Sequence, residues 1–478
     1  MGTPEKYHYA RLADELARRI QEGIYRPDER LPSIRHLSRE NALSPTTVHQ
    51  AFMELEKRGL VEARERSGYF ARLPRSEVLP PPRRRSPAGE PRKVVFDAVL
   101  AQLLSASEQD SRMVPLGGAL LGPAYFPARH FSRLMKSFSP ERVARLSGYG
   151  PLLGNADLRR HLAQRPLGGH RVVGAEEICI TSGCMEAVNL CLRAVTRPGD
   201  AVAVESPTFF GFLQVLEDLG LYAVEVPTDP DQGVDPDALA RILEDGRVKA
   251  GLFIPNHHNP LGACMPSENK RRIVALCTQR GIPLIEDDIY GDLHFPVGRP
   301  DTLKAYDEEG LVLYCSSLSK TLAPGLRVGW TMPGRFFQRV VRLRTGSVIS
   351  SPPLMQQVTA DLLESGFYDR HLRRLRMELS NNLRRLSAAV ARSFPPGTRM
   401  THPTGGFLLW VELPDGVDGM AVYEEALRQG VAILPGSLCS PSRRYRNCLR
   451  LSGGHPWSNE LEEGVKRLGE VIGRSRVL

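Results

Sequence analysis

A proline-rich segment near residue 80 divides this chain into two parts that must fold separately. Six prolines lie between Pro74 and Pro91, three of them consecutive at Pro80–Pro82, and Arg83–Arg85 follow directly. Proline interrupts helices and is excluded from central strands, and proline-rich sequence favours an extended spacer. We therefore expect a linker over residues 73–92, between a domain at 1–72 and a larger one at 93–478.

The composition of the chain excludes several classes of protein. Of its 478 residues, 41% are hydrophobic and 24% are charged, which is the balance of a folded globular protein rather than a disordered one. The sequence has no apolar run long enough to span a membrane, and its beginning lacks the apolar core of a secretory signal. The net charge of +9 is compatible with a polyanionic partner. The eight cysteines form no Cys-x-x-Cys pair, so we expect a cytoplasmic protein with reduced thiols, no metal site and no membrane partner.

The first 72 residues show the pattern of three helices followed by a short hairpin. Apolar side chains recur at helical spacing in three stretches, at Leu12, Leu16 and Ile20, at Ile34 and Leu37, and at Val48, Phe52 and Leu55. Ser44 is an expected N-cap with Pro45 as the first helical residue, and Gly59 is an expected helix end. Residues 60–63 and 68–71 are expected to form two strands around a charged turn. Three helices and a hairpin predict a winged helix-turn-helix domain.

A winged helix-turn-helix presents particular side chains to double-stranded DNA. The second helix of the motif enters the major groove with its N-terminal residues at the base edges. The candidates for contact with DNA are Thr46, Thr47, His49 and Gln50 on this helix, Arg35 on the helix before it, and Arg64, Arg66 and Gly68 in the wing. A three-helix unit with a purely structural role is the alternative.

Three segments of this domain together resemble the GntR family of bacterial DNA-binding domains. They are residues 23–35, the helix at 45–59 and the wing at 68–70, and the resemblance covers residues 7–72. It implies that the domain binds a double-stranded DNA operator. The chain departs from the family at Pro45, where an arginine is usual, which leaves the operator sequence open. The basic linker fits either a solvated spacer or a spacer that also contacts DNA phosphates.

The sequence after residue 93 alternates short strands with helical segments. A helix is expected at 94–104, and strands are expected at Glu177–Thr181, Ala201–Glu205, Lys249–Ile254, Pro283–Asp287 and Leu311–Cys315. Alternation of this kind predicts an α/β domain with a largely parallel sheet and flanking helices. Ligands of such sheets bind beyond the carboxyl ends of the strands, so residues that directly follow a strand are the candidates for a site.

Four segments after these strands carry residues suited to ligand chemistry. The glycine turn at 181–185 opens a helix and either cradles a phosphate or is merely a tight turn. Asn259, followed by proline, either presents an amide donor or forms an ordinary turn. Asp287, at the end of an apolar strand, either keeps a heterocyclic nitrogen protonated or caps the next helix. Lys320 lies among hydroxyls seven residues before Arg327, which fits a Schiff-base lysine beside a phosphate clamp, or a surface charge.

In this order the four segments resemble the class I/II aminotransferases of fold type I, which use pyridoxal 5′-phosphate (PLP), over residues 113–478. The resemblance implies a mostly parallel sheet with flanking helices and a smaller C-terminal α+β subdomain. It implies that Lys320 forms the internal aldimine and moves the substrate proton, that Asp287 pairs with the pyridinium, and that Arg450 binds the substrate carboxylate. The other PLP contacts it implies are Asn259 and Tyr290 at the phenolic oxygen; Gly183, Cys184, Met185, Ser317, Ser319 and Arg327 at the phosphate; Phe209 on the ring; and Tyr149 at the phosphate of the neighbouring subunit. The alternative for Phe209 is that it packs in the apolar core. The alternative for Arg450 is that it is an ordinary surface residue.

The fusion of the two parts resembles the MocR subfamily of bacterial transcription regulators over the whole chain. That resemblance implies a cytoplasmic homodimer, which is on the nucleoid when it is bound to DNA. It also implies that the binding of PLP, or of an amino compound at PLP, changes the arrangement of the two DNA-binding domains of the dimer. It leaves two functions open: a regulator that senses through the Lys320 aldimine, or a working aminotransferase with a DNA-binding domain. Intact Lys320, Asp287 and Arg327 argue against a third, a scaffold without cofactor. The loop at Ala119–Gly122 departs from the family's Gly-x-Pro-Asp, which leaves the effector or substrate open.

Overall fold

Two separate apolar cores divide the chain into two units, Met1–Leu79 and Pro80–Leu478. The structure is a computed structural model that describes residues 5–21, 24–25, 29–64, 67–71, 79–85, 89–95, 110, 112–168, 172–295 and 298–475. Within these residues, no helix is both long and apolar enough to cross a membrane. All eight cysteines are free thiols, as the sequence predicts.

The smaller unit consists of three helices and a two-stranded hairpin, as expected. Its elements are α1 (Glu5–Gln21), α2 (Ile34–Glu40), α3 (Pro45–Lys57), β1 (Val61–Arg64) and β2 (Gly68–Ala71). Phe52 on α3 is fully buried, and its ring stacks on that of Tyr69 in β2 with the centroids 4.2 Å apart. Ser44 accepts a hydrogen bond from the backbone N–H of Thr47 at 3.1 Å, and this bond caps α3 at the expected residue. The hairpin is therefore held to the third helix by an aromatic stack.

A nine-stranded mixed sheet forms the centre of the larger unit. In spatial order its strands are β3 (Pro91–Lys93), β7 (Tyr222–Asp229), β6 (Ala201–Ser206), β9 (Val248–Phe253), β10 (Leu284–Asp287), β11 (Val312–Ser317), β12 (Gly329–Met332) and β5 (Cys179–Thr181), and β8 (Gly233–Val234) pairs with β7. The five strands from β7 to β11 are parallel, and the strands at both edges are antiparallel. All five strands expected from the sequence are present, each within a few residues of its expected bounds.

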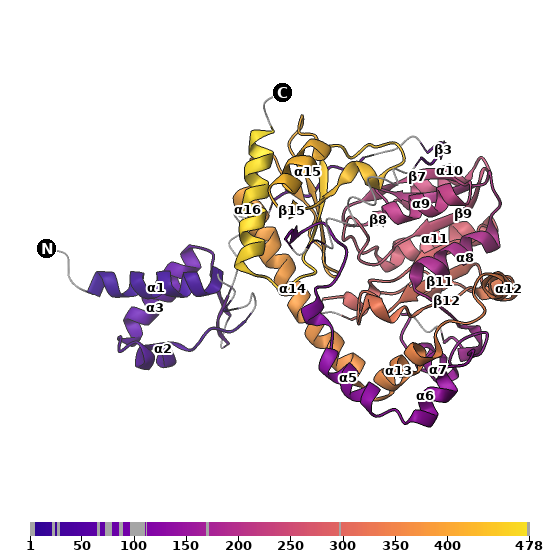
Figure 1. The fold of residues 1–478 in the computed structure, drawn as a ribbon. Helices are drawn as coiled ribbons and strands as arrows, with labels where there is room; N and C mark the ends of the chain where they lie inside the picture. Colours follow the sequence, from indigo (N-terminus) through magenta and orange to yellow (C-terminus); the bar gives the residue numbers. More distant parts are fainter. Residues whose placement is uncertain are drawn as a thin grey trace. The chain divides into compact units, whose positions relative to one another are not determined.

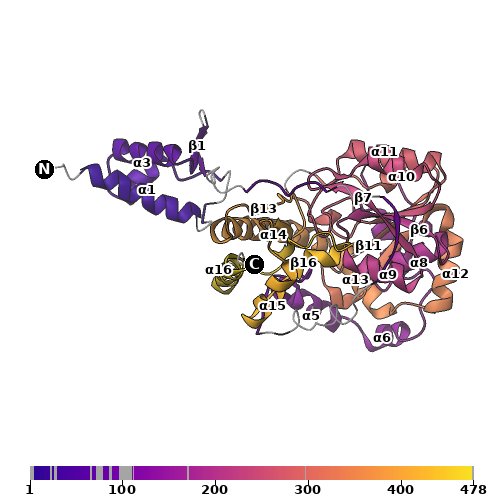
Figure 2. The same cartoon turned by 90° about the horizontal axis from the view of Figure 1, so that it is seen from above.

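Helices cover both faces of this sheet (Figure 1), because successive residues of a strand point to opposite sides. Along β6, Val202 and Val204 belong to one apolar cluster, whereas Ala201 and Ala203 belong to the other. Helices α8 (Cys184–Val195) and α9 (Phe210–Asp218) contribute to the first cluster, and α10 (Pro236–Leu243) and α11 (Ser267–Gln279) contribute to the second. Figure 2 shows the two pairs of helices on opposite sides of the sheet.

A four-stranded antiparallel sheet forms the smaller C-terminal part of this unit. Its strands lie in the order β13 (Arg399–Met400), β14 (Leu408–Glu412), β17 (Cys448–Ser452) and β16 (Leu434–Pro435), and β15 (Val431–Ala432) pairs separately with β4 (Val114–Pro115). The long helix α14 (Phe367–Ser393) leads into this part and contacts α16 (Asn459–Arg474), which in turn contacts α15 (Gly419–Arg428). The remaining helices are α5 (Ala128–Lys136), α6 (Pro140–Leu146), α7 (Ala156–Ala163), α12 (Phe337–Ser347) and α13 (Pro353–Glu364). This part is the α+β subdomain that the sequence predicts.

The proline-rich segment differs from the expectation of a solvated spacer over all of residues 73–92. Residues 80–85 belong to the larger unit, where Pro82 is buried, and residues 91–93 form the edge strand β3 against β7. The reason is that the arginines of this segment find carboxylate and carbonyl partners on the larger unit. The helix expected at 94–104 lies, apart from the non-helical Val94 and Val95, outside the described residues, as does Arg66 of the wing.

The separate cores predict that the two units unfold independently. Phe52→Ala removes a fully buried ring from the smaller core, which typically costs about 3–5 kcal/mol. In calorimetry of the full-length protein, we expect this change to lower the unfolding transition of the smaller unit and to leave that of the larger unit in place. Leu158→Ala, at a fully buried position of the larger core, is the matched control and shifts the other transition. Transitions that move together in both variants would contradict the division.

Candidate functional site

A cavity of about 230 Å³ lies at the carboxyl ends of the parallel strands. β10 ends at Asp287, β11 ends at Ser317, and Ile254 directly follows β9; all three residues line the cavity. Ten residues that the sequence predicts as cofactor contacts also line it: Cys184, Met185, Phe209, Asn259, Asp287, Tyr290, Ser317, Ser319, Lys320 and Arg327. The parallel strands thus deliver side chains from distant parts of the sequence to one place.

Lys320 is half-buried in the loop that follows β11. Its Nζ donates a hydrogen bond to the carbonyl oxygen of Ala119 at 2.6 Å. The next residue, Thr321, holds the loop in place, because its Oγ1 accepts a hydrogen bond from the hydroxyl of Tyr368 at 2.8 Å. The carbonyl oxygen of Thr321 also lies 2.9 Å from Nε2 of His371. The amine of Lys320 is therefore held at a defined wall of the cavity.

Asp287 is a buried carboxylate with few partners in its own chain. It is 3% exposed, and its Oδ1 accepts hydrogen bonds from the backbone N–H of Ile289 at 3.1 Å and from the thiol of Cys184 at 3.2 Å. Burial raises the pKa of Asp287 to about 7, and these two hydrogen bonds oppose that rise. Among the described residues, no cationic side chain forms an ion pair with Asp287. A ligand that brings a protonated nitrogen to this carboxylate would supply the missing positive charge.

Tyr290, Asn259 and Arg450 form a chain of hydrogen bonds beside the cavity. The amide nitrogen of Asn259 donates to the hydroxyl of Tyr290 at 3.3 Å, and its amide oxygen accepts from Arg450 at 2.9 Å. Arg450 is 1% exposed rather than a surface residue, and a second guanidinium nitrogen donates to the carbonyl oxygen of Gly117 at 2.6 Å. Burial raises the pKa of Tyr290 above its ordinary value, so its hydroxyl keeps its proton and acts as a donor.

A further part of the cavity is suited to an anion. Helix α8 begins there, and its N-cap, Gly183, has φ +119° and leaves the first backbone N–H groups without a capping side chain. The positive φ of Gly183 favours glycine, and without a side chain this residue lets the guanidinium of Arg327 lie close to the start of α8. Ser317, Ser319 and Arg327 line the same cavity. Backbone amides, hydroxyls and a guanidinium together are the donors that bind phosphate in proteins.

Two predicted cofactor contacts do not line the cavity: Gly183, which directly precedes the lining residues Cys184 and Met185, and Tyr149. The side chain of Tyr149 is 83% exposed. Its loop is joined to the loop before α13 by a hydrogen bond from the N–H of Gly150 to Oγ of Ser350 at 3.3 Å. A contact between Tyr149 and a bound phosphate therefore requires a second chain.

The apolar wall of the cavity was not expected from the sequence. Leu120, Ile254, Ile289 and Pro324 line the cavity together with the polar residues described above. Two of these residues could have been predicted from the sequence, since Ile254 directly follows a predicted strand and Ile289 lies two residues after Asp287. These side chains give the cavity an apolar wall against which an aromatic ring can pack.

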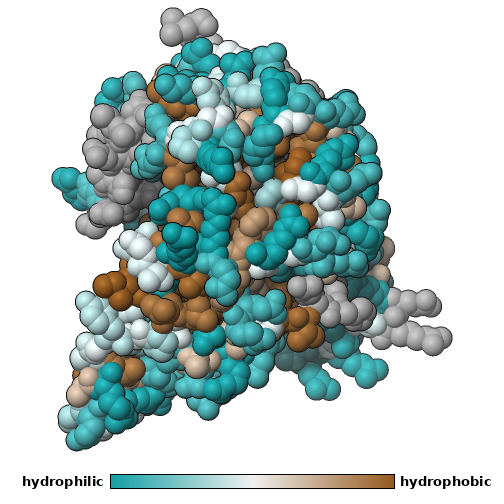
Figure 3. All heavy atoms as spheres, turned by 90° about the vertical axis from the view of Figure 1, so that its right-hand side faces the viewer, coloured by the Kyte–Doolittle hydropathy of each residue, from teal (hydrophilic) through white to brown (hydrophobic). Residues whose placement is uncertain are grey.

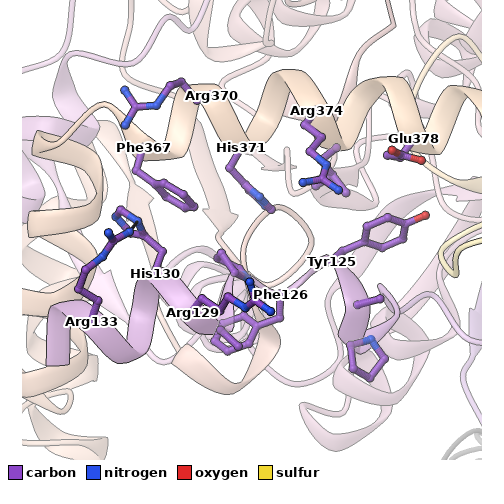
Figure 4. A pocket seen from close by; sticks show the side chains of 15 residues that line it. Tyr125, Phe126, Arg129, His130, Arg133, Phe367, Arg370, His371, Arg374 and Glu378 are labelled. Carbon is purple, nitrogen blue, oxygen red and sulfur yellow. Dashed lines mark hydrogen bonds between the residues drawn. The ribbon is translucent and has the colours of Figure 1, made fainter. Parts of the chain in front are cut away.

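A second and larger hollow of about 800 Å³ lies between α5 and α14 (Figure 4). Its walls are mostly basic and aromatic and include Tyr125, Phe126, Arg129, His130, Arg133, Phe367, Arg370, His371, Arg374 and Glu378. In Figure 4 the ring of His371 points from α14 into this hollow. The same ring contacts the carbonyl oxygen of Thr321, so the hollow backs onto the loop of Lys320. None of these residues follows a predicted strand, which is why sequence reasoning did not select them.

The DNA-reading helix of the smaller unit exposes three of its four predicted side chains. Thr46, His49 and Gln50 are exposed at the start of α3, and Nδ1 of His49 lies 3.2 Å from the hydroxyl of Tyr69. Thr47 differs from the expectation, because it is 8% exposed and its hydroxyl lies 2.7 Å from that of Ser44. Thr47 therefore stabilises the start of the helix and does not present a free hydroxyl to a base.

The predicted phosphate and wing contacts are also at the surface. Arg35 is exposed on α2, and Arg64 is exposed at the end of β1 with its guanidinium 4.4 Å from the ring centroid of Phe70. Gly68 has φ +100°, a backbone conformation that side chains disfavour, and it allows the tight turn of the wing. These positions leave Arg35 and Arg64 accessible to a nucleic acid.

Family comparisons match both parts of the chain. The model of aminotransferase class I and II matches residues 138–468, and that of bacterial regulatory proteins, gntR family, matches residues 8–70. The chain is 39% identical to the uncharacterized HTH-type transcriptional regulator YjiR of Escherichia coli, over 98% of this chain and 99% of the relative. It is 30% identical to the 2-aminoadipate transaminase of Thermus thermophilus, over 78% of this chain and 94% of the relative.

Solved structures resemble the chain over about the length of its larger unit. One is LysN, an α-aminoadipate aminotransferase of Thermus thermophilus complexed with N-(5′-phosphopyridoxyl)-L-leucine, with a TM-score of 0.73 and 29% identity over 80% of this chain and 96% of that one. Another is the kynurenine aminotransferase of Pyrococcus horikoshii, with a TM-score of 0.72 and 28% identity over 80% and 95%. The mixed sheet and its helices are thus a fold shared with aminotransferases.

The buried carboxylate of Asp287 predicts that the free energy of unfolding of the ligand-free protein depends on pH. Its folded-state pKa of about 7 exceeds the ordinary value near 4, so folding retains a proton that the unfolded chain releases between these values. The stability of the ligand-free wild type therefore falls as the pH rises from about 4 to 7, and Asp287→Asn escapes that loss. At pH 8 we expect the variant to be more stable by on the order of 2–4 kcal/mol.

Thermal unfolding of both ligand-free proteins at pH 8 and pH 5 measures this difference, which should shrink at the lower pH. Asp231→Asn, at an exposed carboxylate, is the matched control and should change neither value. A wild type that is more stable than Asp287→Asn at pH 8 would contradict the assignment of this pH dependence to Asp287.

Proposed function

The chain belongs to the class I and II aminotransferase family and carries a gntR-family DNA-binding domain. We propose that the aminotransferase-like domain controls the DNA-binding domain. The chain is a regulator of the MocR type, with a GntR-type DNA-binding domain fused to a PLP-binding, aminotransferase-like domain. In the proposed function, Lys320 carries PLP, and an amino compound that reacts there changes the affinity for DNA. One observation carries the proposal: a single cavity joins Lys320 and the unpaired, buried Asp287 in a chain that exposes a DNA-reading helix.

The donors and acceptors around the cavity fit PLP. When bound, PLP supplies an aldehyde that bonds to amines and a ring that withdraws electrons from the carbon attached to that nitrogen. Asp287 would stabilise the protonated ring nitrogen, because its carboxylate has no other cationic partner among the described residues. Asn259 and Tyr290 would hold the phenolic oxygen, and Phe209 would lie against the ring. Gly183, Cys184, Met185, Ser317, Ser319 and Arg327 would hold the phosphate.

Lys320 and Arg450 would act on the amino compound. Lys320 would hold PLP through its Nζ, and the same nitrogen would serve as the base that accepts a proton from the Cα of the amino compound. The contact of Nζ with the carbonyl oxygen of Ala119 keeps the amine at the cavity wall. Nε of Arg450 is buried and has no hydrogen-bond partner among the described residues, which leaves the guanidinium a donor for a carboxylate. An amino acid is therefore the class of ligand that the cavity favours.

A working aminotransferase is the second candidate function. It is favoured by Lys320 and Asp287 in one cavity with Arg450 bonded to Asn259 of its lining, and by a relative at 30% identity that is named a transaminase. The regulator is preferred because the relative that matches both parts of the chain is named a transcriptional regulator. Such a regulator would act on chromosomal DNA in the bacterial cytoplasm and associate with the nucleoid. Its operator contacts would come from Arg35, Thr46, His49, Gln50, Arg64 and Gly68.

A homodimer would complete the site. Exposed apolar side chains accompany Tyr149 on two adjoining loops, with Leu152 51% exposed and Ile349 56% exposed. Hydrophobic side chains also gather in the lower half of the face shown in Figure 3. Apolar surface of this kind is unusual on a monomer, and burial against a second copy would remove it from water. The same arrangement would bring Tyr149 to the phosphate in the partner's cavity and present two reading helices to two half-sites.

Covalent trapping tests the role of Lys320. The full-length protein is loaded with PLP and treated with sodium borohydride, and the modified peptide is identified by mass spectrometry. We expect the label on Lys320 in the wild type and no covalent label in Lys320→Ala, because no other lysine of the described residues lines the cavity. Lys249→Ala, at an exposed lysine, is the matched control and should keep the label. A label on another residue in Lys320→Ala would contradict the assignment.

A panel of amino acids and amines separates the two candidate functions. Each compound is added to the PLP-loaded protein, and the cofactor absorbance and the amount of 2-oxo acid released are measured together. A stable spectral change with at most one 2-oxo acid per protein chain supports the sensor. Continued release in the presence of a 2-oxo acid acceptor supports the enzyme, and no spectral response to any compound contradicts both.

A further inference from the structure

The segment Pro80–Arg85, termed the strap, is fastened along the larger unit. The carbonyl oxygen of Pro80 accepts a hydrogen bond from the N–H of Met400 at 3.0 Å, and that of Pro81 accepts one from Arg399 at 3.2 Å. Pro82 is buried. The strap therefore runs beside β13, although its prolines cannot donate to a strand ladder.

The three arginines that end the strap contact residues in or next to both sheets of the larger unit. Arg83 forms two hydrogen bonds with the carboxylate of Asp415, at 3.0 and 3.1 Å, just beyond β14 of the four-stranded sheet. Arg84 forms an ion pair with Asp235, the N-cap of α10, which covers the nine-stranded sheet. A strap held at both sheets is sensitive to any movement of one sheet against the other.

Glu412, at the end of β14, shows that the strap is part of the fold. This carboxylate is 2% exposed, and a buried charge is costly unless it is paired. Its Oε2 accepts a hydrogen bond from the backbone N–H of Arg83 at 2.7 Å, and its Oε1 lies 3.6 Å from the guanidinium of Arg85. The partners that the structure gives this carboxylate thus come from the strap, so releasing the strap would leave a buried charge unpaired.

Arg85 links the strap to the wall of the cavity. Its guanidinium donates to the carbonyl oxygen of Arg444 at 2.7 Å and lies 5.1 Å from the ring centroid of Tyr445. Tyr445 is 4% exposed, and its hydroxyl lies 3.0 Å from that of Ser206, which ends β6. Three residues later, Phe209 lines the cavity. A cation–π contact and a hydrogen bond therefore lead from the strap to the end of β6, three residues before the aromatic side chain at the proposed PLP ring.

We propose that the strap couples the cavity to the DNA-binding unit: Arg85 positions the Phe209 wall through Tyr445 and Ser206, and ligand binding in turn tightens or loosens the strap. The inference rests on the proposed function and names its regulation. With the strap docked, the covalent connection between the units starts after Ala71, the last residue of β2, and ends before Pro80, the first residue of the larger unit. Release would add the six strap residues to that connection, and a longer tether changes the effective concentration of one reading head beside the other.

Hydrogen exchange of the full-length protein tests the coupling with PLP alone as the probe. The amide of Arg83 is bonded to Glu412, so exchange of the peptide that covers residues 79–85 reports how often the strap opens. We expect PLP to change this exchange by at least about fivefold, the lower range of measured couplings. Because coupling is reciprocal, Arg85→Ala should change the PLP dissociation constant by a similar factor.

Two further variants separate coupling from docking. Tyr445→Phe keeps the ring under Arg85 and removes the hydroxyl that reaches Ser206. We expect its strap to stay protected while PLP loses its effect on exchange, an outcome that a merely structural role would not produce. Arg92→Ala is the matched control, since Arg92 is an exposed basic residue of β3 that lies outside the strap, and it should behave as the wild type.

The outcomes distinguish the inference from the function on which it rests. Equal PLP dissociation constants in wild type and Arg85→Ala, with the same strap exchange with and without PLP, would overturn the coupling. If Arg85→Ala fails to fold, the comparison of wild type and Tyr445→Phe decides, and a PLP effect of equal size in both overturns the proposed path. A wild type that binds no PLP would instead overturn the proposed function.

Discussion

The unpaired burial of Asp287 at the end of a parallel strand is the constraint on which the site depends. The preceding residue on β10, Glu286, is equally buried, but its carboxylate accepts hydrogen bonds from the backbone N–H groups of Leu303 and Lys304 at 2.7 and 2.9 Å. Asp287 has a single backbone donor and the weak donor of the Cys184 thiol. Burial and the nearby Asp288 nevertheless raise the pKa of Glu286 to about 8, so both carboxylates are costly to ionise, but only that of Asp287 lines the cavity, where a ligand can compensate the cost. Loss of stability at a functional site is the expected result.

Much of this arrangement could be predicted from local patterns. The β-rich runs that became β5, β6, β9, β10 and β11 are short, apolar and bounded by turn residues, and the chemistry-bearing residues directly follow them. Because the carboxyl ends of parallel strands meet at one edge, Asn259, Asp287 and Lys320 could be expected in one cavity before the structure was known. The three helices and wing of the smaller unit were predictable for the same reason, since Ser44 and Pro45 mark the start of α3 locally.

The rest depends on contacts between residues that are far apart in the sequence. The backbone N–H of Arg83 bonds to a carboxylate 329 positions away, and nothing in the proline-rich segment itself indicates that partner. The thiol of Cys184 meets Asp287 across 103 positions, and Arg450 meets Asn259 across 191. Thr47 was expected at a base edge because exposed and capping threonines have the same sequence signature at a helix start. Such roles are decided by tertiary packing rather than by residue type.

In the proposed coupling, the strap of the larger unit connects the cavity at the end of the parallel sheet to the winged-helix unit. The central claim is that the state of the cavity changes DNA binding, and the most direct measurement is the affinity of the full-length protein for DNA with and without PLP. The DNA is a fragment selected by the protein itself from a random pool, and the affinity is measured at fixed salt because phosphate contacts depend on it. We expect PLP, alone or with a responsive amino acid, to change the dissociation constant by at least about fivefold. Equal affinities for the ligand-free, PLP-loaded and amino-acid-treated protein would contradict the claim.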